Sequence, residues 1–458
     1  MAAPALPSPR VIDQPSTLRN EAVFVAVAML VALGVRLGWI YFVRPEVGLL
    51  DDAGYYHFFA QGVAEGRGYV RPEGTPTAFW PVGYPAVLGA LYEVVGTSLR
   101  AAKLLNVCLG AATVGLVYLL ARRWLPPRPS FLASMLHALT PGAIGYVSVT
   151  MSETLFTFLF VAALTVLAYT KDGATGPGRD RVGLVASCIG FGVLVAAANY
   201  VRGQALLLPL IAVPWLLLLG WRPRQATLYA CAALAVVAVL SLPWLVRNTL
   251  RFEELTFLST NMGMNFWLGH REGANGGPDY HDQLAFAQRF AHLPRLKQEP
   301  AWSREGFREG LDYALSHPLA EPRLSLLKVY QLYRSDHDAL LWNEQNGATP
   351  IFSPATRDRL RLLADGFYYS LGLLALAGLA QGLRRRAGWA VFALLVIGYW
   401  TLIHVVFYGE PRLHVPLLPV MALLAAAAIA MFPTRYRPGG ASDDRARPEA
   451  AAGDIQSV

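Results

Sequence analysis

Charged side chains are scarce in this sequence. They make up 15% of its 458 residues, whereas hydrophobic side chains make up 54%. Soluble domains carry roughly 25% charged residues, so this composition excludes an ordinary soluble protein. It indicates a chain that is built into a membrane.

Cysteine is also rare, and its positions exclude two kinds of site. Cys108, Cys188 and Cys231 are the only cysteines, and each lies within an apolar stretch. A disulfide framework or a zinc site needs cysteines that are paired or closely spaced in a polar setting. We therefore interpret all three as small core residues.

The positive charge of the chain does not indicate a nucleic-acid partner. The formal net charge is +8, but the basic residues lie between apolar runs, as they do in cytoplasmic loops of membrane proteins. They are Arg122, Arg123, Arg128, Lys171, Arg179, Arg181, Arg222, Arg224, Arg384, Arg385, Arg386, Arg435 and Arg437. We expect a lipid bilayer, and no nucleic acid, as the partner of this charge.

Ten apolar segments have the length expected of membrane spans. They are 22–43, 102–121, 131–149, 153–170, 182–199, 203–220, 226–246, 365–382, 388–406 and 413–432. The first is too long for the core of a signal peptide and lacks a small-residue cleavage motif, so no cleavable signal is predicted. The fold class that follows is an all-α polytopic bundle of about 10–11 transmembrane helices.

An eleventh apolar run, 82–97, does not fit a full crossing. If it crossed, the basic clusters that follow it would change sides, against the charge rule. Pro81 and Pro85 are typical of a broken or interfacial helix. We predict a re-entrant or interfacial segment here.

The same pattern predicts the domain organisation. We expect a disordered cytoplasmic tail at 1–20, an N-terminal transmembrane module at 21–246 with a first outer loop at 44–98, an extracytoplasmic domain at 247–364, C-terminal transmembrane helices at 365–432 and a disordered cytoplasmic tail at 433–458. Within the outer domain, 303–316 and 322–336 have the period of short amphipathic helices. We expect this domain to be small and helical, with β-structure as an option.

Two adjacent carboxylates, Asp51 and Asp52, open the first outer loop. A helix that begins at Asp51 carries four apolar or aromatic side chains on one face: Tyr55, Phe58, Phe59 and Val63. Such a helix can lie flat on the membrane, with both acids at the positive end of the helix dipole. The alternative is that the two acids only cap a surface helix.

Polar groups at the ends of the spans all fall on the predicted outer side. They are Asp51, Asp52, Glu153, Arg202, Arg247, Glu410, Arg412 and His414. Ionisable groups at membrane depth are costly and tend to mark a site. Arginine binds phosphate oxygens through its planar fork, while a carboxylate takes a proton from a hydroxyl or holds a divalent cation. The set therefore indicates a lipid substrate that contains phosphate.

Each of these residues also has a plainer interpretation. Glu153 can cap its helix together with Ser152, Arg202 can extend its head to the interface, and Arg247 can anchor a span end. The histidines His57, His270 and His414 lack the spacing of a metal site. The aromatic residues Tyr55, Tyr56, Trp80 and Tyr84 fit an interfacial belt as well as a wall for sugar stacking.

Taken in order, five stretches resemble the GT-C superfamily glycosyltransferases of the bacterial protein-mannosyltransferase-like branch, to which the aminoarabinose transferases are related. DDAGYYHFFAQGVAEGRGY with PTAFWPVGYP is similar to the first outer loop of that family, and MSETLFTFLF to its second acidic position. NYVRGQALLLPL, then LPWLVRNTLRF with LSTNMGMNFWLGH, resembles the middle, and YGEPRLHVPLLPVMALLAA the closing Glu-x-Arg segment.

The resemblance implies a reaction and roles for individual residues. The reaction is the inverting transfer of a sugar from a polyprenyl-phosphate donor to a glycan, lipid or protein acceptor, on the periplasmic or exterior side of the inner (plasma) membrane. The implied catalytic residues are Asp51, Asp52 and Glu153, with Asp51 and Glu153 as ligands of a divalent cation such as Mg or Mn. The implied substrate-binding residues are Tyr55, Tyr56, Trp80, Tyr84, Arg202, Arg247, Asn261, Asn265, Glu410, Arg412 and His414.

Two other classes of function are open to the sequence. A transporter or flippase for a lipid-linked sugar can use the same cavity without chemistry, but such proteins more often show paired repeats and ionisable groups near the bilayer midplane. A non-catalytic membrane scaffold leaves the shared side of the acids and arginines unexplained.

Overall fold

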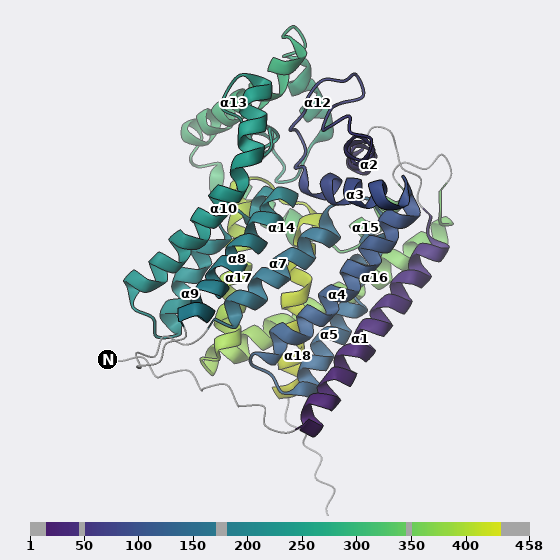
Figure 1. The fold of residues 1–458 in the computed structure, drawn as a ribbon, viewed down its shortest axis with the longest axis vertical. Helices are drawn as coiled ribbons and strands as arrows, with labels where there is room; N and C mark the ends of the chain where they lie inside the picture. The colour runs from purple at the N-terminus through teal and green to yellow at the C-terminus, as the bar shows by residue number, and fades with distance from the viewer. Residues whose placement is uncertain (1–14, 45–50, 171–180, 345–349, 432–458) are drawn as a thin grey trace, which may run out of the picture.

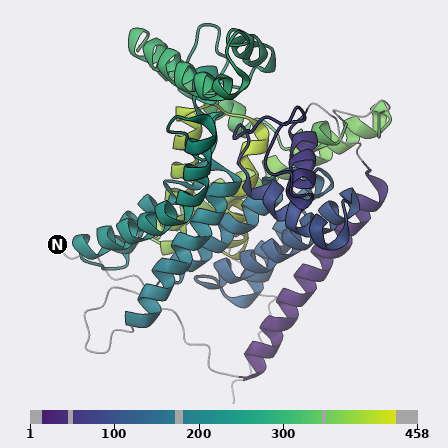
Figure 2. The same ribbon diagram turned by 45° about the horizontal axis from the view of Figure 1, so that its top comes forward.

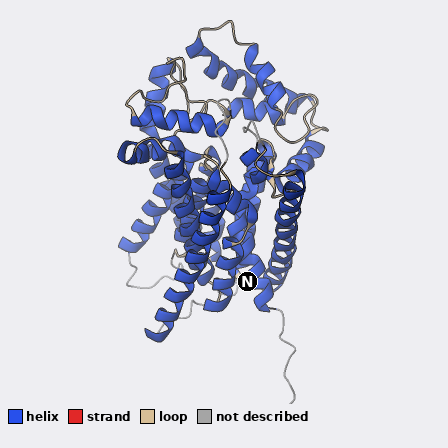
Figure 3. Cartoon of the chain, turned by 90° about the vertical axis from the view of Figure 1, so that its right-hand side faces the viewer, coloured by secondary structure: helices blue, strands red, loops and turns tan. Residues whose placement is uncertain are grey.

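The structure is a computed structural model that describes residues 15–44, 51–170, 181–344 and 350–431, which are helical over most of their length (Figures 1 and 3). In this part of the chain no strand forms, and the only β-type pairing is an isolated bridge between Val70 and Pro76. The expected all-α membrane bundle is confirmed. The option of β-structure in the outer domain is wrong for its described residues.

Seven helical segments are long and apolar enough to cross a membrane among the residues described. They are α1 (Pro15–Phe42), α4 (Leu99–Arg122), α8 (Arg181–Val201), α10 (Pro223–Phe252), α16 (Pro354–Arg384), α17 (Gly388–Val406) and the pair η4 (Pro411–Leu417) and α18 (Leu418–Met431). Two shorter apolar segments lie at the predicted spans 153–170 and 203–220. The first is α7 (Glu153–Ala168), and the second, Gly203–Leu218, is interrupted and consists of η2 (Gly203–Ala205), η3 (Leu208–Ile211) and α9 (Ala212–Leu218). The chain is a multi-pass membrane protein.

The predicted single span at 131–149 is wrong. The chain forms α5 (Pro127–Ala138), α6 (Pro141–Gly145) and η1 (Tyr146–Ser148) instead. Pro141 has no N–H to donate, and a residue that precedes proline avoids helical geometry, so the helix ends before Thr140. The Ala138 carbonyl accepts a hydrogen bond from Arg36 Nη1 at 3.0 Å, and Gly142 N donates to Asp336 Oδ2 at 3.0 Å.

The segment at 82–97 forms α3 (Gly83–Val95), a helix of 13 residues. At 1.5 Å per residue it is about 20 Å long, which is shorter than the roughly 30 Å of a hydrocarbon core. Figure 1 shows α3 lying crosswise at one end of the bundle, beside α2 (Asp52–Ala64). A helix of this length and direction agrees with the predicted interfacial segment.

The centre of the bundle is α7, which packs between α4 and α8. Phe156, Phe160, Leu164 and Leu167 on α7 are completely buried. Burial of each such side chain contributes about 1.5–3 kcal/mol, so α7 is held firmly along its length. Its first residue, Glu153, is therefore fixed at the end of the bundle where α2 and α3 lie.

The two ends of the bundle carry different groups. At the end opposite to Glu153, Arg122 Nε donates to Glu21 Oε2 of α1 at 2.9 Å, and Arg123 Nε donates to the carbonyl of Ala168, the last residue of α7, at 2.8 Å. Basic residues thus border the end that the charge rule assigns to the cytoplasm. The predicted site residues border the other end.

At that other end lie α11 (Met262–Gly269), α12 (Tyr280–Gln288), α13 (Arg295–Ser316), α14 (Glu321–Tyr333) and α15 (Asp338–Glu344). Figure 1 shows α12 and α13 beyond the end of the bundle. The predicted helices at 303–316 and 322–336 correspond to α13 and α14. Gly263 and Gly306 allow α11 and α13 to touch, because a Cβ at Gly263 would lie 1.7 Å from the Ser303 carbonyl oxygen. Side chains at these two positions would force the helices apart.

The predicted domain boundaries lie inside helices. Helix α10 continues past 246 to Phe252, α16 starts at Pro354 rather than near 365, and α1 starts at Pro15 inside the predicted tail. The rest of the N-terminal tail (1–14) and the C-terminal tail (432–458) lie outside the described residues. The division into modules therefore stays a proposal.

Glu299 joins the first outer loop to α13. Its buried carboxylate accepts hydrogen bonds from Arg71 (Nε at 2.9 Å, Nη2 at 2.7 Å), Thr77 Oγ1 at 2.6 Å, Ala78 N at 2.9 Å and Thr260 Oγ1 at 3.0 Å. A buried carboxylate is tolerated when donors and a cation surround it, as they do here. The loop residues next to Trp80 are fixed by this contact.

Replacing Glu299 with alanine is expected to lower the free energy of unfolding by about 3 kcal/mol, because Arg71 and three neutral donors lose their acceptor together. Thermal unfolding of the purified protein in detergent measures the change. The matched control is Glu309→Ala, which removes the more exposed pair with Arg289 (2.6 Å) and should cost less than about 1 kcal/mol. Equal losses in the two variants would contradict a fastening role for Glu299.

Candidate active site

Helix α2 starts with Asp51 as its N-cap. The Asp51 Oδ1 atom accepts a hydrogen bond from Gly54 N at 2.7 Å, so capping, the plainer interpretation, holds for this residue. Part of the face that we expected to rest on lipid packs against protein: Phe59 is completely buried, and the Phe59 and Tyr69 ring centroids are 4.5 Å apart. Tyr55, Phe58 and Val63 on the same face are half-buried, so contact of this face with lipid stays a prediction.

Asp52 is the first residue of α2, and its partly buried carboxylate joins an ion pair of two buried residues, Arg412 and Glu410. Its Oδ2 atom accepts from Arg412 Nη1 at 2.8 Å, and its Oδ1 atom accepts from Trp80 Nε1 at 2.9 Å. Arg412 Nε also donates to Glu410 Oε2 at 2.8 Å, and the guanidinium lies 4.8 Å from the centroid of the Trp342 ring. We call Asp52, Arg412 and Glu410 the carboxylate–arginine triad.

The local sequence explains how Glu410 and Arg412 come to hold one another. Glu410 is extended (φ −154°, ψ 143°), and Pro411 follows at the start of η4. Proline disfavours a helical residue before it and fixes the first turn after it. The side chains on either side of Pro411 are thereby held at one end of the last span.

Glu153 and Arg202 form a second buried pair. Arg202 Nη2 donates to Glu153 Oε1, and Arg202 Nε donates to Ser152 Oγ at 2.9 Å. Ser152 makes no capping hydrogen bond, and both charged side chains are buried. Neither the cap proposed for Ser152 nor the extended arginine proposed for Arg202 is seen. The Glu153 Oε2 atom is buried and has no hydrogen-bond partner among the described residues.

The triad and the second pair lie within electrostatic range of each other. The Arg202 charge acts on Asp52, and the Tyr56 hydroxyl lies in the fields of Asp52, Arg202 and Glu153. Burial, reinforced by the Asp52 carboxylate, raises the pKa of Tyr56, so this hydroxyl stays neutral between the charges. The structure thus brings Asp52, Glu153, Arg202, Glu410 and Arg412 together.

The two neighbouring aspartates differ in acidity. Burial raises the pKa of Asp51 above the ordinary 3.8, and the nearby Asp52 charge adds to the effect. Burial opposes ionisation of Asp52 as well, but the Arg412 charge and hydrogen bond bring its pKa below the ordinary value. Asp51 is therefore the better proton acceptor of the two.

The predicted aromatic residues separate into two groups. The Tyr55 ring stacks on Trp80 with centroids 4.2 Å apart, and Trp80 donates to Asp52, so this pair borders the triad. Tyr84 is completely buried, its hydroxyl donates to Asn106 Oδ1 at 3.2 Å, and its ring contacts Tyr56 edge-on at 5.7 Å. Tyr84 belongs to the core and offers no surface to a sugar.

Arg247 is not part of the triad. Its Nη2 atom donates to the Tyr69 carbonyl and its Nη1 atom to the Thr77 carbonyl, each at 2.8 Å, and the guanidinium lies 4.6 Å from the Trp244 ring centroid. The Arg247 guanidinium therefore holds the backbone of the first outer loop through these two carbonyls. Arg247 does lie on the same end of the bundle as Asp51.

Three further predicted residues also lie in other surroundings. His414 is completely buried between the Leu332 carbonyl (3.0 Å) and Asp336 Oδ1 (3.1 Å), so it joins η4 to the end of α14. Asn261 precedes α11 and accepts from Ser259 Oγ at 3.0 Å, and Asn265 lies within α11. No recorded contact links these three residues to the triad.

Asp338 is a candidate that the sequence did not single out. Its Oδ2 atom accepts from Tyr146 Oη at 2.9 Å and from Trp342 Nε1 at 3.0 Å. The signal was the acid-rich stretch SDHDALLW, which begins at Ser335 in the predicted helix at 322–336 and continues beyond it. Nothing in that stretch shows that it lies beside Glu410.

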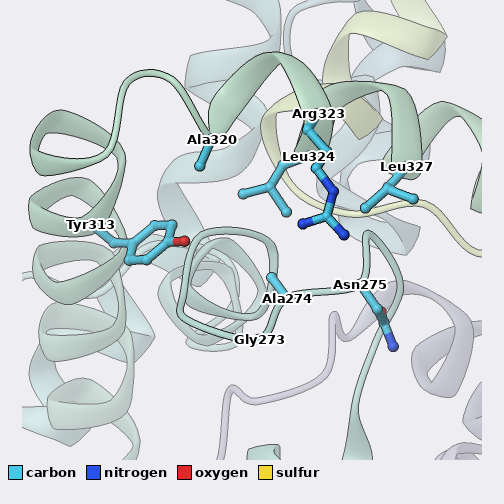
Figure 4. Close-up of a pocket in the computed structure, with 8 residues that line it drawn as sticks. All are labelled: Gly273, Ala274, Asn275, Tyr313, Ala320, Arg323, Leu324 and Leu327. Carbon is cyan, nitrogen blue, oxygen red and sulfur yellow. The ribbon is translucent and has the colours of Figure 1, made fainter.

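Two cavities adjoin this region. One, of about 340 Å³, is lined by Asn275, Gly277, Pro278, Tyr280, Gln331, Arg334, Asp338, Gly409, Glu410 and Pro411. The other, of about 310 Å³, is lined by the residues labelled in Figure 4, among them Tyr313, Arg323 and Leu324. Asn275 borders both cavities, but only the first contains a member of the triad.

The predicted metal ligands Asp51 and Glu153 do not belong to a group of three potential ligands in the described part of the chain. The group that does form is Asp279, His281 and Asp282, on and next to α12. Arg271 already pairs with Asp282 at 2.6 Å and with Asp279 at 3.7 Å. We assign no metal to that exposed group.

Parts of this chain are similar in sequence to known glycosyltransferases. Residues 80–246 match the family model described as dolichyl-phosphate-mannose-protein mannosyltransferase. An undecaprenyl phosphate-alpha-4-amino-4-deoxy-L-arabinose arabinosyl transferase from Pseudomonas aeruginosa (strain UCBPP-PA14) is 30% identical over 204 residues, which cover 43% of this chain and 35% of the relative. The match thus spans about a third of the relative's length. The resemblance to both groups of transferases is confirmed.

Solved structures extend the likeness over most of the chain. The archaeal oligosaccharyltransferase AglB from Archaeoglobus fulgidus, solved with an inhibitory peptide and a dolichol-phosphate, superposes with a TM-score of 0.54 at 17% identity, over 91% of this chain and 51% of that one. The chain has the GT-C fold. A further structure of the A. fulgidus oligosaccharyltransferase, with a TM-score of 0.51 at 16% identity over 89% of this chain and 48% of that one, is a complex with zinc and sulfate.

The GT-C fold accounts for the arrangement of the site. A bundle of membrane helices carries a short interfacial loop helix at one end, and the outer domain lies over that end (Figures 1 and 2). The triad lies where the first outer loop meets the last span. At this level of identity the likeness to solved structures concerns the fold alone.

Proposed function

We propose that this protein is a membrane glycosyltransferase that moves one sugar from a polyprenyl-phosphate donor to an acceptor hydroxyl at the outer end of the bundle. The observation that carries the proposal is the pair of buried ionic groups, Asp52–Arg412–Glu410 and Glu153–Arg202, beside the first outer loop. Two arginines and a raised-pKa aspartate supply the groups that cleavage of a sugar phosphate needs. The matched transferases supply the class of donor.

In this mechanism Asp51 is the general base. It would take the proton of the acceptor hydroxyl as that oxygen attacks the anomeric carbon on the face opposite to the phosphate. The bond between the anomeric carbon and the phosphate oxygen breaks, the electron pair leaves with the phosphate, and the configuration inverts. Asp52 is less suited to the role because Trp80 and Arg412 occupy both of its oxygens.

Arg202 and Arg412 are the groups that we assign to the donor phosphate. Both guanidiniums are buried and act on Asp52, and an arginine in a dry site stabilises the charge of a leaving phosphate more than it does in water. Arg247 is assigned a positioning role, because it holds the Tyr69 and Thr77 carbonyls. The family resemblance implied substrate binding for Arg202 and Arg247 alike, and we keep that role for Arg202 alone.

One atom of this site, a carboxylate oxygen of Glu153, is suited to bind a divalent cation. The orphaned Oε2 atom of Glu153 is a buried carboxylate oxygen without a partner, and Mg²⁺ often uses one or two protein carboxylates together with substrate phosphates. Glu153 would hold the ion, which would neutralise part of the phosphate charge, whereas Asp51, the second predicted ligand, is assigned to the proton of the acceptor instead. The roles of Asp51 and Arg202 stand without it.

The function is tested in liposomes that contain the purified protein. Undecaprenyl-phosphate-linked mannose, glucose and 4-amino-4-deoxy-arabinose are supplied with glycan, lipid and peptide acceptors that carry a hydroxyl, and release of undecaprenyl phosphate is measured. Release that depends on an acceptor supports transfer. Movement of the labelled donor between leaflets without release would support the transporter alternative and overturn the proposal.

The raised pKa of Asp51 gives an expected pH dependence. The base must be deprotonated, so kcat/KM rises with pH through the pKa of this carboxyl, and the acid limb is expected above pH 3.8, the ordinary aspartate value. A pH profile of undecaprenyl phosphate release measures the limb. The limb should disappear in Asp51→Asn, and a limb that is unchanged in this variant would assign it to another group.

A further inference from the structure

The cavity of about 340 Å³ beside Glu410 is built from segments far apart in the sequence. Gln331 and Arg334 come from the end of α14 and the residue after it, Asp338 begins α15, and Glu410 precedes η4. The loop from Asn275 to Tyr280 closes a further side. A site formed where the outer domain meets the last span is well placed for a ligand of the transfer reaction.

Hydrogen-bonding groups line this cavity. Glu410 Oε1 accepts from Tyr280 Oη at 3.2 Å, and Gln331 Nε2 donates to the Asn275 carbonyl at 3.4 Å. Asp338 uses one oxygen, Oδ2, for two donors, while its Oδ1 atom has no recorded hydrogen bond to the described residues. The lining therefore offers carboxylate, amide and hydroxyl groups within the space of one small ring.

The charges in the cavity decide between classes of ligand. Glu410 is balanced by Arg412, but the recorded hydrogen-bond partners of Asp338 are the neutral groups of Tyr146 and Trp342. Arg334 also lines the cavity, so with Arg412 balancing Glu410 the two carboxylates leave no excess charge for an ion to complement, and a polar lining disfavours an apolar ligand. Asp338 and Glu410 belong to no group of three potential metal ligands in the described part of the chain. A ring that carries several hydroxyl donors satisfies such acceptors best.

We infer that this cavity is a saccharide subsite, in which Asp338 and Glu410 accept hydrogen bonds from hydroxyls of one sugar ring. The choice of a sugar rests on the proposed transfer function. Glu410 is shared with the triad, so a ring bound here contacts the group that orients Arg412, which in turn holds Asp52. The ring is either the sugar of the donor or the terminal residue of a glycan acceptor.

Binding is tested first without any transfer. Saturation-transfer NMR of the full-length protein in detergent is recorded with methyl mannoside, methyl glucoside and methyl arabinoside, and at least one is expected to bind saturably. Asp338→Asn replaces an acceptor by a donor and is expected to weaken that binding roughly 10-fold or more. Gln331→Trp narrows the cavity from a half-exposed position on α14 and should do the same without removing a buried charge.

The matched control is Arg323→Ala in the neighbouring cavity of Figure 4, which should leave binding unchanged. The inference is overturned if none of the three glycosides binds, if Asp338→Asn and Gln331→Trp bind as well as the unaltered protein, or if Ca²⁺ or methylammonium binds at Asp338 in place of the glycosides. A loss in Arg323→Ala equal to that in Asp338→Asn also overturns it.

Kinetics then identify the source of the sugar. A higher KM for the undecaprenyl-phosphate sugar in Gln331→Trp assigns the cavity to the donor, and a higher KM for a glycan acceptor assigns it to the acceptor. If glycosides bind in a manner that depends on Asp338 but the protein releases no undecaprenyl phosphate, the subsite stands and the transferase proposal is rejected. If Asp338→Asn and Gln331→Trp both transfer sugar as fast as the unaltered protein, the transferase proposal stands and the subsite is rejected.

Discussion

Replacing Asp51 with asparagine is expected to lower sugar transfer by roughly 10²- to 10⁴-fold, the usual contribution of a general base. The fold should survive, because asparagine is as good an N-cap as aspartate and can still accept the hydrogen bond from Gly54 N, now 2.7 Å long. The measurement is the initial rate of undecaprenyl phosphate release in liposomes, with thermal unfolding recorded for the same preparation.

Two neighbouring substitutions serve as controls for this result. Asp51→Ala removes the charge and the cap together, so it should lose the same activity and about 1 kcal/mol of stability in addition. Asp52→Asn breaks the contact with Arg412 and should lower stability more than Asp51→Asn does. Full activity in Asp51→Asn would remove Asp51 from the role of base, and an unfolded Asp51→Asn protein would contradict the expected capping by asparagine.

Replacing Arg412 with methionine is expected to destabilise the protein by about 3–5 kcal/mol at pH 8, because Asp52 and Glu410 are left buried without their shared cation. Transfer should be lost as well, since Arg412 is assigned to the donor phosphate. Thermal unfolding between pH 5 and pH 8 measures the effect. The control is Arg304→Met, which removes exposed pairs with Glu254 and Glu305 and should change stability by less than about 1 kcal/mol.

The loss in Arg412→Met should depend on pH in a defined direction. Without the guanidinium, burial raises the folded-state pKa of both carboxyls above their unfolded values, so protonation favours the folded state. The variant is therefore expected to be most stable at low pH and to lose stability as pH rises through these raised pKa values. A deficit that is equal at pH 5 and pH 8 would contradict the proposed triad.

The positions of the membrane-spanning helices could be predicted because the length of an apolar run is a local property of the sequence. A single α-helix lies at seven of the ten predicted positions, and at 203–220 and 413–432 the segment combines 3₁₀ turns with a shorter α-helix. The tenth, 131–149, failed because Pro141 interrupts the backbone ladder of a segment whose composition is still apolar. The end of α10 and the start of α16 were misplaced for a related reason: both helices continue beyond their apolar stretch, into residues that contact the outer domain.

The site was less predictable because its contacts are not local. Sequence identified the end of the bundle at which acids and arginines gather, but not which ones pair. Arg202 and Arg247 appeared equivalent, yet one pairs with Glu153 while the other holds loop carbonyls. Asp338 was missed because Tyr146, its hydroxyl partner, is 192 positions away in the chain. His414 was implied as a substrate-binding residue, but it is buried between Leu332 and Asp336.

The bond between Asp52 and Arg412 has a consequence for biosynthesis. The two residues are 360 positions apart, so the ribosome has made most of the protein before Asp52 meets its cation. Until the last span enters the membrane, Asp52 lacks its hydrogen-bonded arginine and has only the charge of Arg202 nearby. A chain that is cut short before Arg412 would therefore contain most of the spans without the assembled triad, however well its earlier helices insert.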